Sequence, residues 1–74
     1  MSNQIITMPH RHTVRYKEGT LVIDFEVELL QDGIILYRRG VKVVSGVAQD
    51  IKPIADVVER WLSLKFSQVE VDDS

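Results

Sequence analysis

Strict alternation of apolar and acidic residues marks the segment from Leu21 to Leu29. Apolar side chains occupy every second position, and three carboxylates lie between them: Asp24, Glu26 and Glu28. Because successive side chains of a strand point to opposite faces of a sheet, this pattern predicts a strand with one buried and one solvent-exposed face. A second β-rich run, Ile34 to Arg39, follows Asp32-Gly33, a pair typical of two-residue type I′ turns. A long hairpin is therefore the predicted centre of the fold.

Further strand candidates precede this hairpin. Residues 1–9 form either an arm or a short strand, which we expect Pro9 to end because proline cannot donate to a ladder. His12 to Lys17 is a strand candidate closed by a turn at Glu18-Gly19, where glycine supplies a positive φ. The N-terminal half therefore predicts three or four antiparallel strands.

The two predicted turns fix a register. Val14 then faces Ile23, and the exposed face carries a row across three strands formed by Arg11, Glu26 and Arg39. Opposite charges that face each other across a ladder are favourable, so the row supports both turn assignments.

Arg38 conflicts with this register, because it would lie opposite Val27 on the apolar face. We expect either a β-bulge at Arg38–Gly40 or a position at the rim from which the guanidinium reaches water. Val41 to Val44 then continues as the same bent strand or as a new one.

The apolar period changes from two to 3.6 residues at Asp50. The spacing predicts an amphipathic helix from Asp50 to Phe66, with Asp50 as N-cap, Pro53 in the first turn and Trp61 largely buried. Residues 69–71 alternate and predict a short edge strand, and residues 72–74 are expected to be a mobile tail. The predicted fold class is α+β: an antiparallel sheet of three to five strands with one C-terminal amphipathic helix packed on one face, in a single domain spanning residues 1–74.

Composition excludes several classes of function. The chain has 74 residues, a formal net charge of −2 and no cysteine, so it offers no disulfide, thiol nucleophile or thiolate metal site. Its apolar runs are too short to span a membrane, and its N-terminus lacks the features of a signal peptide, so we expect a cytoplasmic protein. His10 and His12 could share a metal, but no third ligand is indicated. No nucleophile elbow or phosphate-binding loop is present, so neither an enzyme nor a cofactor is expected.

Two kinds of binding are compatible with the exposed sheet face. Apolar side chains on this face predict an interface with an unknown protein partner or with a second copy in a homodimer: Val22, Leu30, Ile35 and Tyr37. In the predicted register Leu30 lies opposite Ile35 and beside Tyr37. The segments Val41–Val44 and Val69–Val71 are candidate edges for strand pairing with a second copy. The alternative is single-stranded nucleic acid, contacted by basic residues and one aromatic: Arg11, Arg15, Arg39 and Tyr37. The acidic residues on the same sheet and the negative net charge favour the protein-binding interpretation.

Short motifs across residues 11–71 give a family resemblance. Arg15-Tyr16, Glu18-Gly19, Glu28 and the Ile-Leu-Tyr of residues 35–37 resemble the small bacterial immunity proteins of the Imm74 type, in which such strands precede a C-terminal amphipathic helix. The resemblance implies a non-catalytic protein that neutralises a cognate toxin by binding it. It assigns no residue of this chain as a toxin contact.

Overall fold

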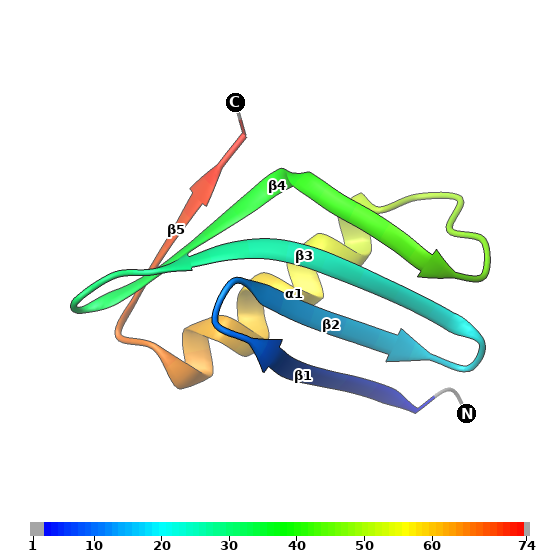
Figure 1. The fold of residues 1–74 in the computed structure, drawn as a ribbon, viewed down its shortest axis with the longest axis horizontal. Coiled ribbons are helices and arrows are strands. Elements are labelled where there is room, and N and C mark those ends of the chain that lie inside the picture. The colour runs from blue at the N-terminus through cyan, green and yellow to red at the C-terminus, as the bar shows by residue number, and fades with distance from the viewer. Residues whose placement is uncertain (1–2, 74) are drawn as a thin grey trace.

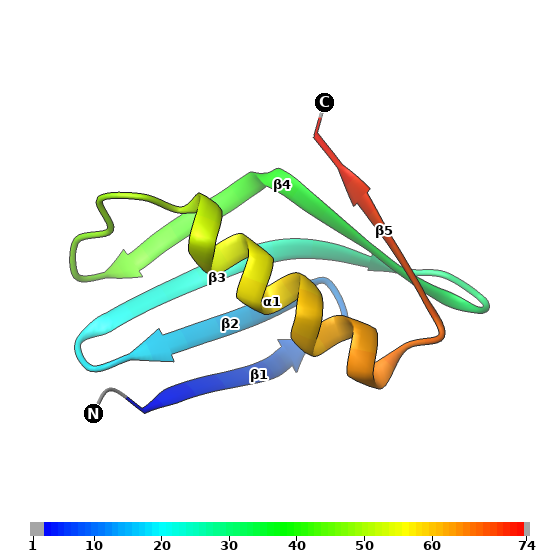
Figure 2. The same cartoon turned by 180° about the vertical axis from the view of Figure 1, so that it is seen from behind.

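Five strands and one helix form two layers in the computed structural model, which describes residues 3–73 (Figure 1). In chain order the elements are β1 (Gln4–His10), β2 (Thr13–Glu18), β3 (Leu21–Leu29), β4 (Gly33–Ser45), α1 (Lys52–Lys65) and β5 (Gln68–Asp72). The strands lie in the order β1-β2-β3-β4-β5; the pairs β1–β2, β2–β3 and β3–β4 are antiparallel, and β5 runs parallel to β4. The helix crosses one face of the sheet (Figure 2). The predicted α+β fold with a C-terminal helix is confirmed, and we call the uncovered face the open face.

The core lies between α1 and the central strands. Its fully or almost fully buried side chains are Val14, Tyr16, Ile23, Phe25, Val27, Ile34, Leu36, Ala55, Val58 and Leu62. Trp61 packs against this core but is only partly buried, because α1 turns Ala55, Val58 and Leu62 toward the sheet. The predicted burial of Trp61 is therefore confirmed in part, because Trp61 packs at the edge of the core and not at its centre, and the apolar face of β3 is as predicted.

The first hairpin turns one residue later than expected. Glu18 pairs with Leu21, so the loop is Gly19-Thr20, with Gly19 at a φ of 60°. Val14 consequently faces Phe25 and not Ile23. A shift of two positions in the partner returns each side chain to the same face, so the buried set is unchanged.

The second hairpin departs further from expectation. The Leu30 amide donates to the Gly33 carbonyl at 2.8 Å, which leaves Gln31-Asp32 as the loop. Within residues 3–73 no residue other than glycine has a positive φ, and Gly33 does not have one either, so the predicted type I′ turn is wrong. Gly33 serves close packing: a Cβ there would collide with the backbone oxygen of Gln68 on β5.

The predicted charge row does not form. Glu26 lies between Thr13 and Tyr37, because Arg11 is in the β1–β2 turn and Arg39 is in the irregular part of β4.

The irregularity in β4 is a bulge of three residues, Arg38–Gly40. Glu26 pairs with Tyr37 but Phe25 pairs with Val41, so three residues of β4 have no partner in β3. Gly40 is required here, since a Cβ would lie 2.6 Å from the Cβ of Glu26. Both the bulge expected at Arg38–Gly40 and the continuation of the same bent strand through Val44 are confirmed.

Arg38 projects to the helix side of the bulge, where three carboxylates surround it. Its Nη2 lies 3.0 Å from Asp56 Oδ1 and 3.8 Å from Glu59 Oε2, and its Nε lies 3.5 Å from Asp73 Oδ1. One guanidinium therefore links β4 to α1 and to the end of β5.

The first and last elements of the described chain are strands, and residues 1 and 2 of the expected arm or short strand lie outside the described residues. β1 continues through Pro9 to His10 after an irregularity between Thr7 and His10, so the expectation that Pro9 ends the strand is wrong. The predicted edge strand at residues 69–71 is part of β5. The expected tail at 72–74 differs from the structure at Asp72, which belongs to β5, and at Asp73, which contacts Arg38; Ser74 lies outside the described residues. Within residues 3–73 no helix is long and apolar enough to cross a membrane.

Candidate protein-binding surface

Cross-strand pairing divides the open face into two halves of opposite charge. Two rows lie toward the β2–β3 turn. One consists of Ile5, Lys17, Val22 and Ser45, and the other consists of Thr7, Arg15, Asp24 and Lys42. Toward the β3–β4 turn lie the rows Thr13, Glu26, Tyr37, Asp72 and Glu28, Ile35, Glu70. We call the second set without Thr13 the acidic surface: Glu26, Glu28, Ile35, Tyr37, Glu70 and Asp72.

The basic half is partly neutralised by a bidentate pair between β2 and β3. Arg15 Nε donates to Asp24 Oδ1 at 2.8 Å, and Nη2 donates to Oδ2 at 3.1 Å. The hydrogen bond from Arg15 lowers the pKa of Asp24, against partial burial and with help from the positive charges of Arg15 and Lys42. The guanidinium of Arg15 is therefore bound to a carboxylate of the neighbouring strand.

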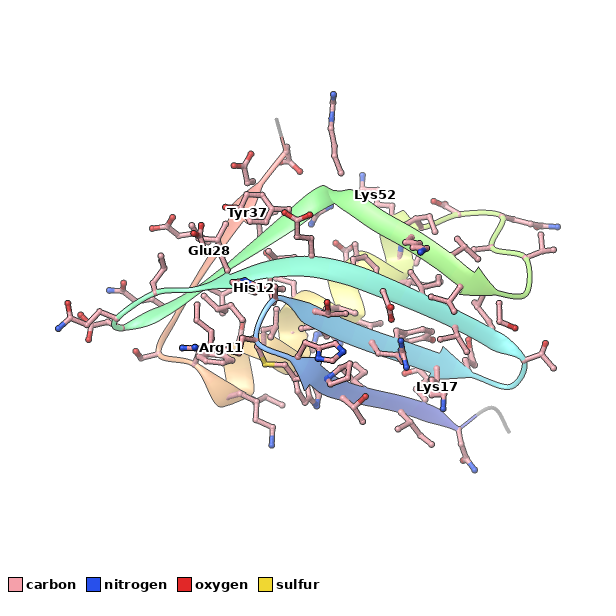
Figure 3. All side chains as sticks on the ribbon, viewed as in Figure 1. Arg11, His12, Lys17, Glu28, Tyr37 and Lys52 are labelled. Carbon is pink, nitrogen blue, oxygen red and sulfur yellow. The ribbon has the colours of Figure 1, made fainter. Side chains whose placement is uncertain are left out.

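Tyr37 lies at the centre of the acidic surface. Its hydroxyl donates to Glu28 Oε2 at 2.7 Å, and Figure 3 shows the two side chains together on β3 and β4. The hydrogen bond to Glu28 raises the pKa of Tyr37, and partial burial and the negative charges of Glu28, Asp72 and Glu26 act in the same direction. The phenol thus stays protonated and oriented.

Three carboxylates of this surface, Glu26, Glu28 and Glu70, are poorly compensated by cations. Ile35 lies between Glu28 and Glu70 in the ladder. Within residues 3–73 no ion pair is formed by Glu26, Glu28 or Glu70. Glu26, Glu28 and Glu70 are therefore exposed to solvent together, and Ile35, Tyr37 and Asp72 lie beside them in the ladder.

A hollow of about 460 Å³ adjoins the acidic surface at the β4 bulge. Glu26, Glu28 and Tyr37 line one side, and Thr13, Lys42 and Gly40 line others, together with His12, Asp24, Phe25 and Val27. His12 lies at its edge in the β1–β2 turn, where its carbonyl accepts a hydrogen bond from the Val27 amide at 2.9 Å. The hollow gives the acidic surface a concave border that can receive a side chain.

The apolar cluster expected on the open face is not assembled. Ile35 and Tyr37 are adjacent, but Val22 lies at the opposite end, paired with Lys17 and Ser45. Leu30 lies in the β3–β4 turn and does not pair with Ile35, because the hairpin register differs from the predicted one.

The residues predicted to contact nucleic acid are likewise dispersed. Arg11 is in the β1–β2 turn, Arg39 is in the bulge, Arg15 is bound to Asp24, and Tyr37 lies among carboxylates. No continuous groove of basic and aromatic residues results within residues 3–73.

The two histidines do not form the arrangement that a shared strand would give. His10 ends β1, opposite Thr13, whereas His12 is in the turn. Within the described part of the chain, no three metal-ligating side chains gather in a site.

Sequence reasoning missed Glu70 and Asp72. Their signal is the alternation Val69-Glu70-Val71-Asp72, which matches the alternation in β3. Comparison of the chain with protein-family models, with curated proteins and with solved structures finds no match.

Proposed function

We propose that this protein is a non-catalytic binding protein whose acidic surface receives a basic surface of a partner protein. The observation that carries the proposal is the gathering of Glu26, Glu28, Glu70 and Asp72 around Ile35 and Tyr37 on the face that α1 leaves uncovered. Complementary charge speeds association and selects the partner. A central aromatic in a partly desolvated position is the side chain that most often contributes binding energy.

The resemblance to immunity proteins gives this proposal a specific form. It would make the partner a toxin, neutralised in the cytoplasm by occlusion. The acidic surface then implies a toxin whose covered surface is rich in arginine and lysine.

Single-stranded nucleic acid receives less support as a ligand. Phosphates would approach the same face as Glu26, Glu28 and Glu70, which repel them. The cations of the basic half are few, and Arg15 is already paired with Asp24.

Capture from the native host with immobilised protein tests the proposal. Glu28→Lys changes the net charge by two within the acidic surface. The double variant Gln49→Lys/Ser63→Lys makes the same change in net charge at two exposed positions, one in the β4–α1 loop and one on α1. We expect wild type and the double variant to retain a basic protein that Glu28→Lys loses, with binding that weakens as salt rises.

Equal loss of the partner in both variants would contradict a role for the acidic surface. A labelled oligothymidylate provides the competing test. Binding to it at low salt that Glu28→Lys strengthens would replace the proposal with the nucleic-acid alternative.

A further inference from the structure

The sheet has two edges, and they differ in charge. Within residues 3–73, β1 pairs with β2 on one side and with no strand on the other. The opposite edge is formed by β5 beside residues 33–37 of β4 and by residues 41–45 of β4, which include the charged Lys42. β5 carries Glu70 and Asp72, whereas β1 has no charged residue from Gln4 to Pro9. Exposed edge strands usually carry charges, prolines or bulges that prevent pairing with other strands. In β1, Pro9 and the irregularity between Thr7 and His10 protect only the C-terminal end, and Gln4 to Thr7 has no such protection.

An apolar groove lies beside this edge. It has a volume of about 290 Å³ and is lined by Gln4, Ile6, Val57, Arg60, Trp61 and Leu64. Leu64 is 81% exposed, although it belongs to the amphipathic helix. Figure 2 shows the C-terminal half of α1 passing beside β1 on this face of the sheet.

The groove residues of α1 form a second stripe beside the core stripe. Val57, Trp61 and Leu64 follow one another at spacings of four and three, which places them on one side of the helix. The core uses Ala55, Val58 and Leu62. The apolar character of Leu64 is therefore unexplained by the fold of a single chain.

We infer that two copies of this chain pair through their β1 edges around a two-fold axis. The edges join antiparallel into one continuous sheet with both helices on the same face, and the groove residues Trp61 and Leu64 of each copy cover the junction. A two-fold contact brings the same surface against itself, so it requires a strand that tolerates its own copy. β1 meets this requirement because it is uncharged over Gln4 to Pro9, whereas β5 would oppose its own carboxylates.

This contact leaves the acidic surface free, because the two copies meet edge to edge and not through the open face. The dimer is therefore compatible with the proposed function but does not depend on it. It would present two acidic surfaces on one side of a continuous sheet.

Sedimentation equilibrium from micromolar to several hundred micromolar protein tests the inference. We expect wild type to form a dimer and Leu64→Lys to raise its dissociation constant by at least about a hundredfold. Burial of one leucine changes a dissociation constant by roughly a factor of ten or more, and a symmetric dimer carries the substitution in both copies. Val47→Lys is the matched control, since Val47 is 87% exposed in the β4–α1 loop and its substitution should leave the dimer unchanged. Both positions are exposed enough that the fold should be retained, as far-UV circular dichroism would verify.

A second substitution tests the strand itself. Gln4→Lys places a charge on the exposed edge and should also dissociate the dimer, and amide exchange in β1 should slow as the protein concentration rises. A mass near 8.5 kDa at every concentration would overturn the inference. So would a dimer that persists in Leu64→Lys and dissociates in salt, because that behaviour would indicate pairing of the two charged halves of the open face.

Discussion

Two leucines separated by one residue on α1 provide a direct test of how the helix lies on the sheet. Leu62 is 0% exposed and Leu64 is 81% exposed. Leu62→Ala removes a fully buried side chain and leaves a cavity, so we expect a loss of about 2–5 kcal/mol in the free energy of unfolding. Leu64 has only about a fifth of its surface out of water. Since full burial of a leucine contributes about 1.5–3 kcal/mol, Leu64→Ala should cost about 0.3–0.6 kcal/mol.

Urea denaturation followed by circular dichroism and by Trp61 fluorescence measures both values. Sub-micromolar protein should be used so that self-association does not contribute. A chain of this length has a total stability of roughly 4–11 kcal/mol, so Leu62→Ala removes much of it and can leave the protein largely unfolded. Equal losses for the two variants, or a larger loss for Leu64→Ala, would refute the orientation of α1 and with it the groove beside β1.

Three further substitutions address the sheet and its charges. Gly33→Ala places a Cβ against the backbone of Gln68, so β5 should detach and its amides should lose protection from exchange. Arg38→Met leaves three largely exposed carboxylates without their shared cation and should cost about 0.5–1 kcal/mol in urea denaturation, a loss that added salt should reduce. The hydrogen bond from Arg15 lowers the pKa of Asp24 in the folded state. The ionised Asp24 therefore stabilises the fold at pH values above its ordinary pKa of 3.8, and this stabilisation is lost as the pH falls through the lower pKa of the folded state. Wild type should therefore exceed Asp24→Asn in stability at neutral pH, and denaturation at decreasing pH should show the difference shrinking; a constant difference would contradict the assignment.

The buried face of the sheet could be predicted from sequence although the predicted pairing of β2 with β3 was wrong by two residues. A shift by an even number of residues leaves every side chain on the same face. Val14 faces Phe25 and not Ile23, but all three remain on the helix side. A charge row depends on the exact partner and not on the face alone, so the predicted row through Glu26 was wrong although the faces were right.

Gly33 shows why the second turn could not be predicted. The Asp-Gly pair is typical of a type I′ turn, yet Gly33 lacks a positive φ and is required because β5 passes close to it. That requirement comes from Gln68, a residue 35 positions later in the chain. No local pattern around Gly33 contains this information.

The acidic surface could be predicted only in part, because it too depends on a pairing between segments that are distant in sequence. Tyr37 and Ile35 were identified as exposed on the correct face, and Glu26 and Glu28 were placed on it. Glu70 joins them through the parallel pairing of β5 with β4, which connects segments on either side of α1. Sequence alternation indicates a strand at this position but does not specify which neighbour it joins.

This parallel pairing also has a consequence for the order of folding. Each strand from β1 to β4 pairs with its neighbour in sequence through a short connection, so these hairpins close at low entropic cost. Among the described strands, β5 differs, because its parallel pairing with β4 requires the connecting segment with α1 to pass across the sheet before Gly33 and Gln68 can pair. We therefore expect β5 to dock last, and it contributes Glu70 and Asp72 to the acidic surface. A partner that requires all four carboxylates would then bind only chains that have completed folding, so recognition itself would discriminate the finished protein from its late intermediates.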